Sequence, residues 1–157
     1  PDGGVFCVDP GTLSAASGRD LLDALAHLET YDVVLSVNDA EARHLADAAE
    51  GGVDRDAAFE SVRTAADAAG VVVHGTEAAV AATPSGTVSV PTLDVSRTLT
   101  ETGAGDRFSA GLARSLAAGW EWDLALAMGN ACATHYVSGA GTGDDADLRA
   151  YVAEHRP

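Results

Sequence analysis

Residues 102–111 read Thr-Gly-Ala-Gly-Asp-Arg-Phe-Ser-Ala-Gly, so that two glycines flank an alanine and an acid and an apolar run follow. Glycine allows the backbone to turn sharply and to approach a ligand closely. Phe108, Leu112 and Leu116 are spaced by four residues, which predicts a helix over 105–118. The start of a helix presents free N–H groups and the positive end of the helix dipole, so this stretch is a candidate anion site.

Asp106 would lie inside that anion site, where a carboxylate repels an anion. One chemical reason to place it there is removal of a proton from a nucleophile that attacks a phosphate. The structural alternative is a tight turn followed by an Asp that favours the helix dipole. On these residues alone the two interpretations are equally supported, because a short glycine motif is weak evidence by itself.

Apolar runs and helical patterns alternate along the rest of the chain. Continuous runs such as 33–37 are typical of strands buried in a parallel sheet, and Pro84 and Gly86 mark the turn of a hairpin. This alternation predicts one α/β domain with an open first sheet edge, at which another segment or chain docks. We expect strands over 5–8, 33–37, 71–73, 78–82, 87–90 and 93–96, helices over 19–29, 38–49, 54–69, 105–118, 122–137 and 145–154, and a flexible loop over 139–143.

The composition excludes some classes of partner. The chain has 157 residues with 24 acids against 9 bases, all of them arginine, for a net charge of −15. That balance excludes a general binder of nucleic acid or anionic membranes, and no membrane-spanning or signal-peptide pattern occurs. Cys7 and Cys132 lie in apolar runs, so we expect buried, unpaired thiols in a reducing, cytoplasmic compartment. Residues 5–8 read as a buried strand very soon after Pro1, which suggests a piece of a longer chain or a processed product.

Two further groups of residues are candidate binding elements. Asn38 and Glu41 follow a strand and form a capping-box pattern, but they also lie where α/β sheets bind ligands, and Glu41 could hold Mg²⁺ through water. Asn130 lies in a helix of small residues that leads into Gly139 and Ala140. Small residues allow close helix packing, and they also leave room for a flat ring. His74 ends a strand and is a weak candidate contact, whereas no zinc spacing and no P-loop occur.

These residues together resemble the C-terminal half of the ribokinase-like (PfkB) carbohydrate kinase family. The family signature Asp-Thr-x-Gly-Ala-Gly-Asp-x-Phe is matched in its latter part by residues 102–108, and the order of elements matches over nearly the whole chain. The resemblance implies a partial three-layer ribokinase-like fold over 1–157, without the N-terminal half that carries most substrate contacts and the lid.

The resemblance also implies ATP-dependent phosphoryl transfer to a hydroxyl of a sugar or related small molecule, with Mg²⁺ as cofactor. It implies roles for individual residues: Asp106 as catalytic base, the N–H groups of Gly103, Ala104 and Gly105 as anion hole, Glu41 as Mg²⁺ ligand through water, and Asn38, His74, Thr76, Asn130, Gly139 and Ala140 as nucleotide-binding residues.

This chain departs from the family pattern in two motifs. The leading Asp-Thr is Thr100-Glu101, so the use of a monovalent cation is open. The family's Thr-x-Gly after the third strand reads His74-Gly75-Thr76, so ribose and phosphate contacts there are open too. We expect the isolated chain to phosphorylate sugar poorly. The alternatives are a nucleotide-binding or regulatory module without kinase activity, or a vitamin or pyrimidine kinase of the same superfamily; a homodimer is also left open.

The charge excess generates the first prediction. Acid-rich, lysine-free chains resemble proteins from salt-loving archaea, in which salt screens self-repulsion. The melting temperature of this chain should therefore rise as KCl increases from dilute buffer to molar concentration. Thermal melts over a KCl series test this, and a midpoint that stays flat or falls would contradict it.

Overall fold

The computed structural model describes residues 3–11, 13–49, 55–95 and 97–154. The strands are β1 Val5–Val8, β2 Asp32–Val37, β3 Gly70–His74, β4 Ala78–Thr83 and β5 Gly86–Pro91, and the helices are α1 Ala15–Leu25, α2 Asp39–Ala48, α3 Arg55–Ala65, α4 Ala104–Ala117, α5 Trp122–His135, the π-helix η1 Tyr136–Ala140 and α6 Asp145–Glu154.

The five strands form one sheet in the order β1-β2-β3-β4-β5. β1, β2 and β3 are parallel, and β4 and β5 form an antiparallel hairpin beside β3. Val8 pairs with Leu35, and Val37 pairs with Val73. The carboxyl ends of the three parallel strands therefore meet at one end of the sheet, which is where ligands bind in α/β folds.

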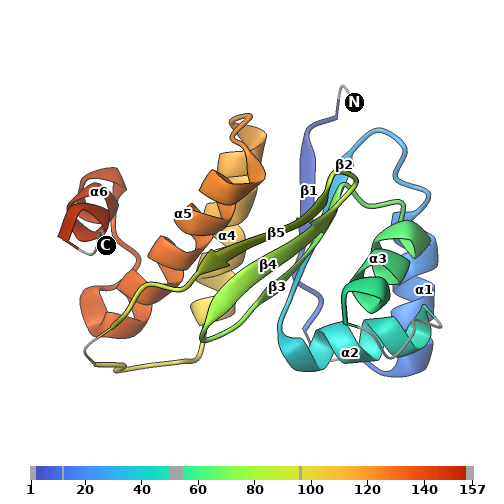
Figure 1. Cartoon of the computed structure of the whole chain (residues 1–157), viewed down its shortest axis with the longest axis horizontal. Coiled ribbons are helices and arrows are strands. Elements are labelled where there is room, and N and C mark those ends of the chain that lie inside the picture. The colour runs from blue at the N-terminus through green and yellow to red at the C-terminus, as the bar shows by residue number, and fades with distance from the viewer. Residues whose placement is uncertain (1–2, 12, 50–54, 96, 155–157) are drawn as a thin grey trace.

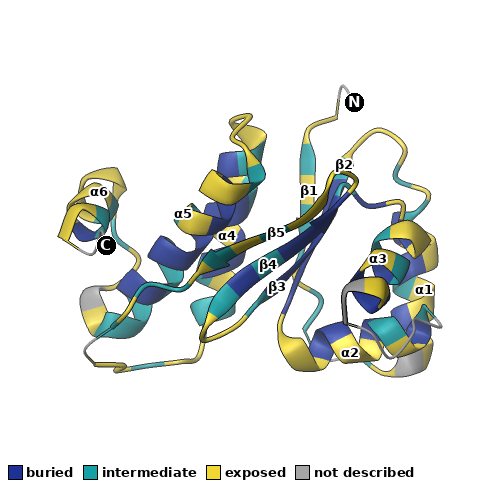
Figure 2. Cartoon of the chain, in the orientation of Figure 1, coloured by how far each residue is buried: buried dark blue, intermediate teal, exposed yellow. Residues whose placement is uncertain are grey.

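Helices cover both faces of this sheet (Figure 1). α1, α2 and α3 lie on one face, α4 and α5 lie on the other, and α6 packs beyond α5. Successive side chains of β2 and β3 point to opposite faces of the sheet, and most residues of both strands are buried (Figure 2). Leu35 and Val71 belong to the core under α1–α3, whereas Val34 and Val72 belong to the core under α4 and α5. This explains why both strands read as continuous apolar runs, and it confirms the predicted three-layer α/β fold.

β1 is less buried than its sequence suggested. We expected a buried strand, but Phe6 is 43 % exposed, and its ring packs against that of Tyr31, with centroids 5.9 Å apart. The reason is the position of β1 at the edge of the sheet, where one side has no neighbouring strand among the described residues. The expectation of an open first edge is confirmed.

Several predicted boundaries were wrong. α1 begins at Ala15 instead of residue 19, because Ser14 caps it by accepting from the backbone N–H of Ser17 at 3.2 Å. It ends at Leu25 instead of residue 29, and α3 ends at Ala65 instead of residue 69. Residues 93–95 are not a strand. The expected start of the helix at residue 54 and the strand end at residue 96 lie outside the described residues.

The segment after α5 also differs from its prediction. α5 ends at His135, and residues 136–140 continue as a π-helix in place of two further helical residues and the start of a loop. Gly139 has φ 91°, which interrupts regular helix at that point. His135 is buried, with Nδ1 3.1 Å from the Gly141 carbonyl oxygen and its ring edge-on to Tyr151.

The two cysteines are unpaired thiols, and both are half-buried. Burial, followed by the nearby Asp9 carboxylate, raises the pKa of the Cys7 thiol to about 11, so it stays protonated and behaves as a small apolar group. Within the described residues, no helix is long and apolar enough to cross a membrane.

The packing of α5 generates a second prediction. Leu126 is 0 % exposed, whereas Leu124 on the same helix is 55 % exposed. Leu126→Ala should lower the free energy of unfolding by ~2–5 kcal/mol because it leaves a cavity under the helix. The matched control Leu124→Ala should change it by at most ~0.5 kcal/mol. Urea denaturation of both variants tests this, and equal losses would mean that α5 does not pack as described.

Candidate active site

The motif at residues 102–108 forms the turn into α4. Gly103 is the N-cap residue and has φ 90°, in the left-handed region that strains any residue with a side chain. The Arg107 N–H donates to the Gly103 carbonyl at 3.2 Å, which closes the first turn of the helix. The predicted turn and helix start are therefore confirmed, with α4 beginning one residue earlier than expected.

Asp106 is exposed in the first turn of α4. The first N–H groups of a helix have no acceptor within the helix, so they are available to an anion near this carboxylate. Among the three predicted anion-hole residues, Ala104 is already engaged, because its N–H donates to the Glu101 carbonyl at 3.1 Å. An anion at this turn would therefore share the Ala104 N–H with the Glu101 carbonyl, or would bind to the N–H groups of Gly103 and Gly105 instead.

Gly105 lets α4 approach the ends of the strands. A Cβ atom at this position would lie 3.0 Å from Cε1 and 3.4 Å from Nε2 of His74, and 3.8 Å from Oδ2 of Asp9. A Cβ atom there would be in tight contact with the His74 ring, which would have to shift by a few tenths of an ångström. The second glycine of the motif is thus explained by close approach, and it brings the motif next to residues at the ends of β1 and β3.

Asp9 is a site residue that the sequence analysis did not select. Its Oδ2 accepts from Ser109 Oγ at 3.1 Å, and Ser109 Oγ also lies 2.8 Å from Oγ of Ser36 on β2. Ser36 and Ser109 are both buried. This network joins the ends of β1 and β2 to α4 one turn after Asp106. The available signal was an acid before a proline, at the end of a strand.

Asn38 and Glu41 form the predicted capping box at the start of α2. Asn38 Oδ1 accepts from the N–H groups of Ala40 and Glu41 at 2.9 and 3.0 Å, and Glu41 Oε2 accepts from the Asn38 N–H at 2.9 Å. Glu41 is buried. One carboxylate oxygen therefore has a structural partner, and within the described residues no cluster of three or more His, Cys, Asp or Glu side chains is arranged to hold a metal.

His74 lies between the strand ends and α4. Its ring packs against Phe108, with centroids 5.0 Å apart, and its buried Nε2 has no hydrogen-bond partner among the described residues. Burial lowers the pKa of His74, and the carboxylates of Asp9, Glu41 and Asp39 oppose that shift. Thr76, two residues further on, is exposed in the turn before β4.

Asn130 and the residues after α5 form a second group. Asn130 is buried, and its Nδ2 donates to the carbonyls of Val90 and Pro91 at 3.2 and 3.0 Å. Both amide hydrogens are therefore used to fasten α5 to the end of β5. Gly139 and Ala140 belong to η1, which the Leu99 N–H contacts by donating to the Val137 carbonyl at 2.7 Å.

Tyr136 connects the two groups. A Cβ atom on Gly103 would lie 3.4 Å from Tyr136 Oη, and the Tyr136 ring centroid is 5.1 Å from Cζ of Arg107. The start of η1 therefore touches the turn that begins α4. The sequence pattern does not mark Tyr136, because it predicts the last turn of an ordinary helix over this segment.

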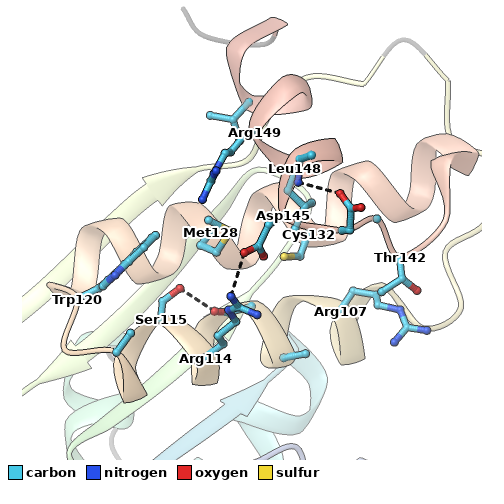
Figure 3. A pocket seen from close by; sticks show the side chains of 17 residues that line it. Arg107, Arg114, Ser115, Trp120, Met128, Cys132, Thr142, Asp145, Leu148 and Arg149 are labelled. Carbon is cyan, nitrogen blue, oxygen red and sulfur yellow. Dashed lines mark hydrogen bonds and ion pairs between the residues drawn. The ribbon is translucent and has the colours of Figure 1, made fainter.

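A cavity of about 1080 Å³ lies between α4, α5 and α6, away from the strand ends (Figure 3). Figure 3 shows Arg114 joined to Asp145, and Met128 and Cys132 between the helices. Of the predicted site residues none lines this cavity, and it reaches the motif only at Arg107. Asp9, His74 and the α4 turn instead meet at the ends of the parallel strands.

The arrangement of the layers matches solved kinases. Ribokinase from Thermotoga maritima has a TM-score of 0.76 and 22% identity, over 96% of this chain and 49% of that one. Aminoimidazole riboside kinase from Salmonella enterica, solved with aminoimidazole riboside and an ATP analog, has a TM-score of 0.77 and 21% identity, over 96% of this chain and 53% of that one. The fold is therefore ribokinase-like, as predicted.

A family model described as prokaryotic ketohexokinase matches residues 4–155, and the chain belongs to that family. Bifunctional protein HldE from Bradyrhizobium diazoefficiens is 39% identical over 117 residues, which are 72% of this chain and 23% of that protein. The chain thus spans about half the length of the solved kinases and under a quarter of this curated relative.

His74 generates a third prediction. Its pKa is lowered in the folded chain, so protons bind the unfolded state more tightly, and stability is lost as pH falls below the unfolded value near 6.5. His74→Gln cannot take up a proton there, so the free energy of unfolding of wild type should fall more steeply than that of the variant from pH ~7.5 to ~5.

Urea denaturation at a series of pH values measures this difference. His44→Gln is the control, because His44 is exposed on α2. If the profiles of wild type and His74→Gln run parallel across this range, the burial of His74 does not control its protonation.

Proposed function

We propose that this chain is the catalytic and nucleotide-binding half of a kinase that transfers the γ-phosphoryl group of ATP to a hydroxyl of a sugar or a related small molecule. A ketohexose is the first acceptor to examine, because the matching family model carries that description. The observation that carries the proposal is Asp106, which stands in the first turn of α4 beside the N–H groups of the helix start and near the ends of the parallel strands.

In this proposal Asp106 accepts the proton of the acceptor hydroxyl. The hydroxyl oxygen forms the new bond to the γ-phosphorus, the bond from that phosphorus to the bridging oxygen breaks, and ADP leaves. The turn at Gly103 and Gly105 places N–H groups where negative charge develops on the transferring group. The hydrogen bonds that join Ser109 to Asp9 and Ser36 hold the start of α4 close to the ends of β1 and β2.

Mg²⁺ and the nucleotide are assigned to the neighbouring residues. Glu41 has one oxygen in the capping box, and a carboxylate that acts through water suits Mg²⁺, which keeps most of its waters. Asp9 and Asp39 stand at the same strand ends. Asn38, His74 and Thr76 are assigned to the phosphate and ribose side. Asn130, Gly139 and Ala140 are assigned to the adenine side, where Asn130 acts by holding α5 to β5.

The missing half of the fold is proposed to add its strands beside β1. The support is the open edge of β1, with Phe6 and Tyr31 exposed on it, and the half-length coverage of the solved kinases. We also propose that the protein works in a reducing cytoplasm at high salt, on the basis of its unpaired cysteines and its net charge of −15.

Asp106→Asn tests the proposal in a complete protein that includes the substrate half. Asn keeps the size and cannot take the proton, so kcat should fall by ~10²–10⁴-fold while ATP affinity stays near that of wild type. Glu41→Gln should mainly raise the Mg²⁺ concentration needed for half-maximal rate. Coupled assays of ADP release with a panel of sugars, and calorimetry with ATP, give both quantities.

The same experiment separates the alternative functions. Since Asn is itself a favourable residue near a helix start, a kcat within about threefold of wild type would mean that Asp106 is only structural. ATP binding with no transfer to any sugar, vitamin or pyrimidine hydroxyl would favour a nucleotide-binding module. Transfer only to a vitamin or pyrimidine would move the chain to another acceptor class within the superfamily.

A further inference from the structure

The proposed phosphate site has a charge problem. Asp9, Asp39, Glu41 and Asp106 all stand at the end of the sheet where a triphosphate would bind. A helix N-terminus offers only about half a positive charge, which falls off within one turn. Phosphate groups brought to this edge are repelled by the carboxylates, so a fixed cation beside the turn would add to the proposed Mg²⁺ in offsetting that repulsion.

Arg107 follows Asp106 in the first turn of α4 and supplies such a cation. Its Cζ lies 5.1 Å from the centroid of the Tyr136 ring, and Tyr136 Oη comes within 3.4 Å of the Cβ position of Gly103. The Arg107 guanidinium thus lies over the Tyr136 ring, and the hydroxyl of that ring lies beside the turn at Gly103. The turn that would hold the anion is supported from behind by a permanently charged side chain.

The surroundings of Arg107 hold its charge in place without cancelling it. Its Nε is buried and has no hydrogen-bond partner in the described part of the chain. Arg114, two turns later on the same helix, is different: it is exposed and pairs with Asp145 at 3.2 Å (Figure 3). The two arginines contribute the same formal charge to α4, but among the described residues a carboxylate in direct contact is found for Arg114 and not for Arg107.

We propose that Arg107 is a positioning residue for the anion site, which acts through Tyr136 and the Gly103 turn to offset the carboxylates and to hold the triphosphate of the donor. This inference rests on the proposed phosphoryl transfer. It gives a role to Arg107, the basic residue within the glycine motif, and to the ring of Tyr136 at the start of η1.

Binding of inorganic tripolyphosphate with Mg²⁺ to the chain, measured by calorimetry at one fixed KCl concentration, tests the proposal. Arg107→Ala should weaken binding by roughly tenfold or more, as expected for the loss of a charge that acts on a phosphate site. Arg107→Lys keeps the charge without the planar stack, so its loss should be smaller. Tyr136→Phe should also weaken binding, because it removes the hydroxyl beside Gly103.

Arg114→Ala is the matched control, because it removes one positive charge from the same helix face. It should leave tripolyphosphate affinity within about twofold of wild type, since a surface charge already paired contributes little. Added guanidinium chloride at low concentration should partly restore binding to Arg107→Ala and not to Tyr136→Phe. A merely structural role of Arg107 would give no such rescue.

The outcomes are distinct. Equal effects of Arg107→Ala and Arg114→Ala, or weakened binding that guanidinium does not restore and that a lowered melting temperature accompanies, would overturn the role of Arg107 alone. If wild type binds neither tripolyphosphate nor ATP with Mg²⁺, the proposed function fails, and the role of Arg107 fails with it.

Discussion

The close approach of α4 to the ends of β1 and β3 is the constraint on which the site depends. Gly105 favours this approach because it has no side chain where the His74 ring lies. Phe108, three residues later, packs on the His74 ring and enters the core under α4 and α5. The same turn thus fixes a core aromatic on one side and leaves Asp106 in solvent on the other. Packing and the candidate chemistry are set by the same few residues.

The sequence was most informative where local pattern and tertiary role agree. The runs in β2 and β3, the Pro84–Gly86 turn and the Asn38–Glu41 cap could be predicted because each signal is complete within a few residues. The turn into α4 could be predicted for the same reason. The start of α1 was missed because it depends on the Ser14 side chain, and the burial of β1 was misjudged because an edge strand and a central strand share one apolar pattern.

The site was predictable in part for a related reason. Asp106, Gly103 and Gly105 lie within one motif, so they could be selected together. Ser109 is 73 residues from Ser36 and 100 residues from Asp9, and only the folded chain brings the three together. Tyr136 was hidden by the π-helix, whose extra residue per turn redirects side chains that an ordinary helical pattern would place elsewhere.

The two edges of the sheet differ because Asn130 of α5 hydrogen-bonds to the end of β5. On the outer side, the Asn130 amide occupies the carbonyls of Val90 and Pro91, and the proline has no N–H to offer a further strand. At the other edge, β1 has no neighbouring strand among the described residues. The end of β5 beside α5 is therefore a poor place for a further strand to pair, whereas the edge at β1 leads to the end of the sheet that carries Asp9.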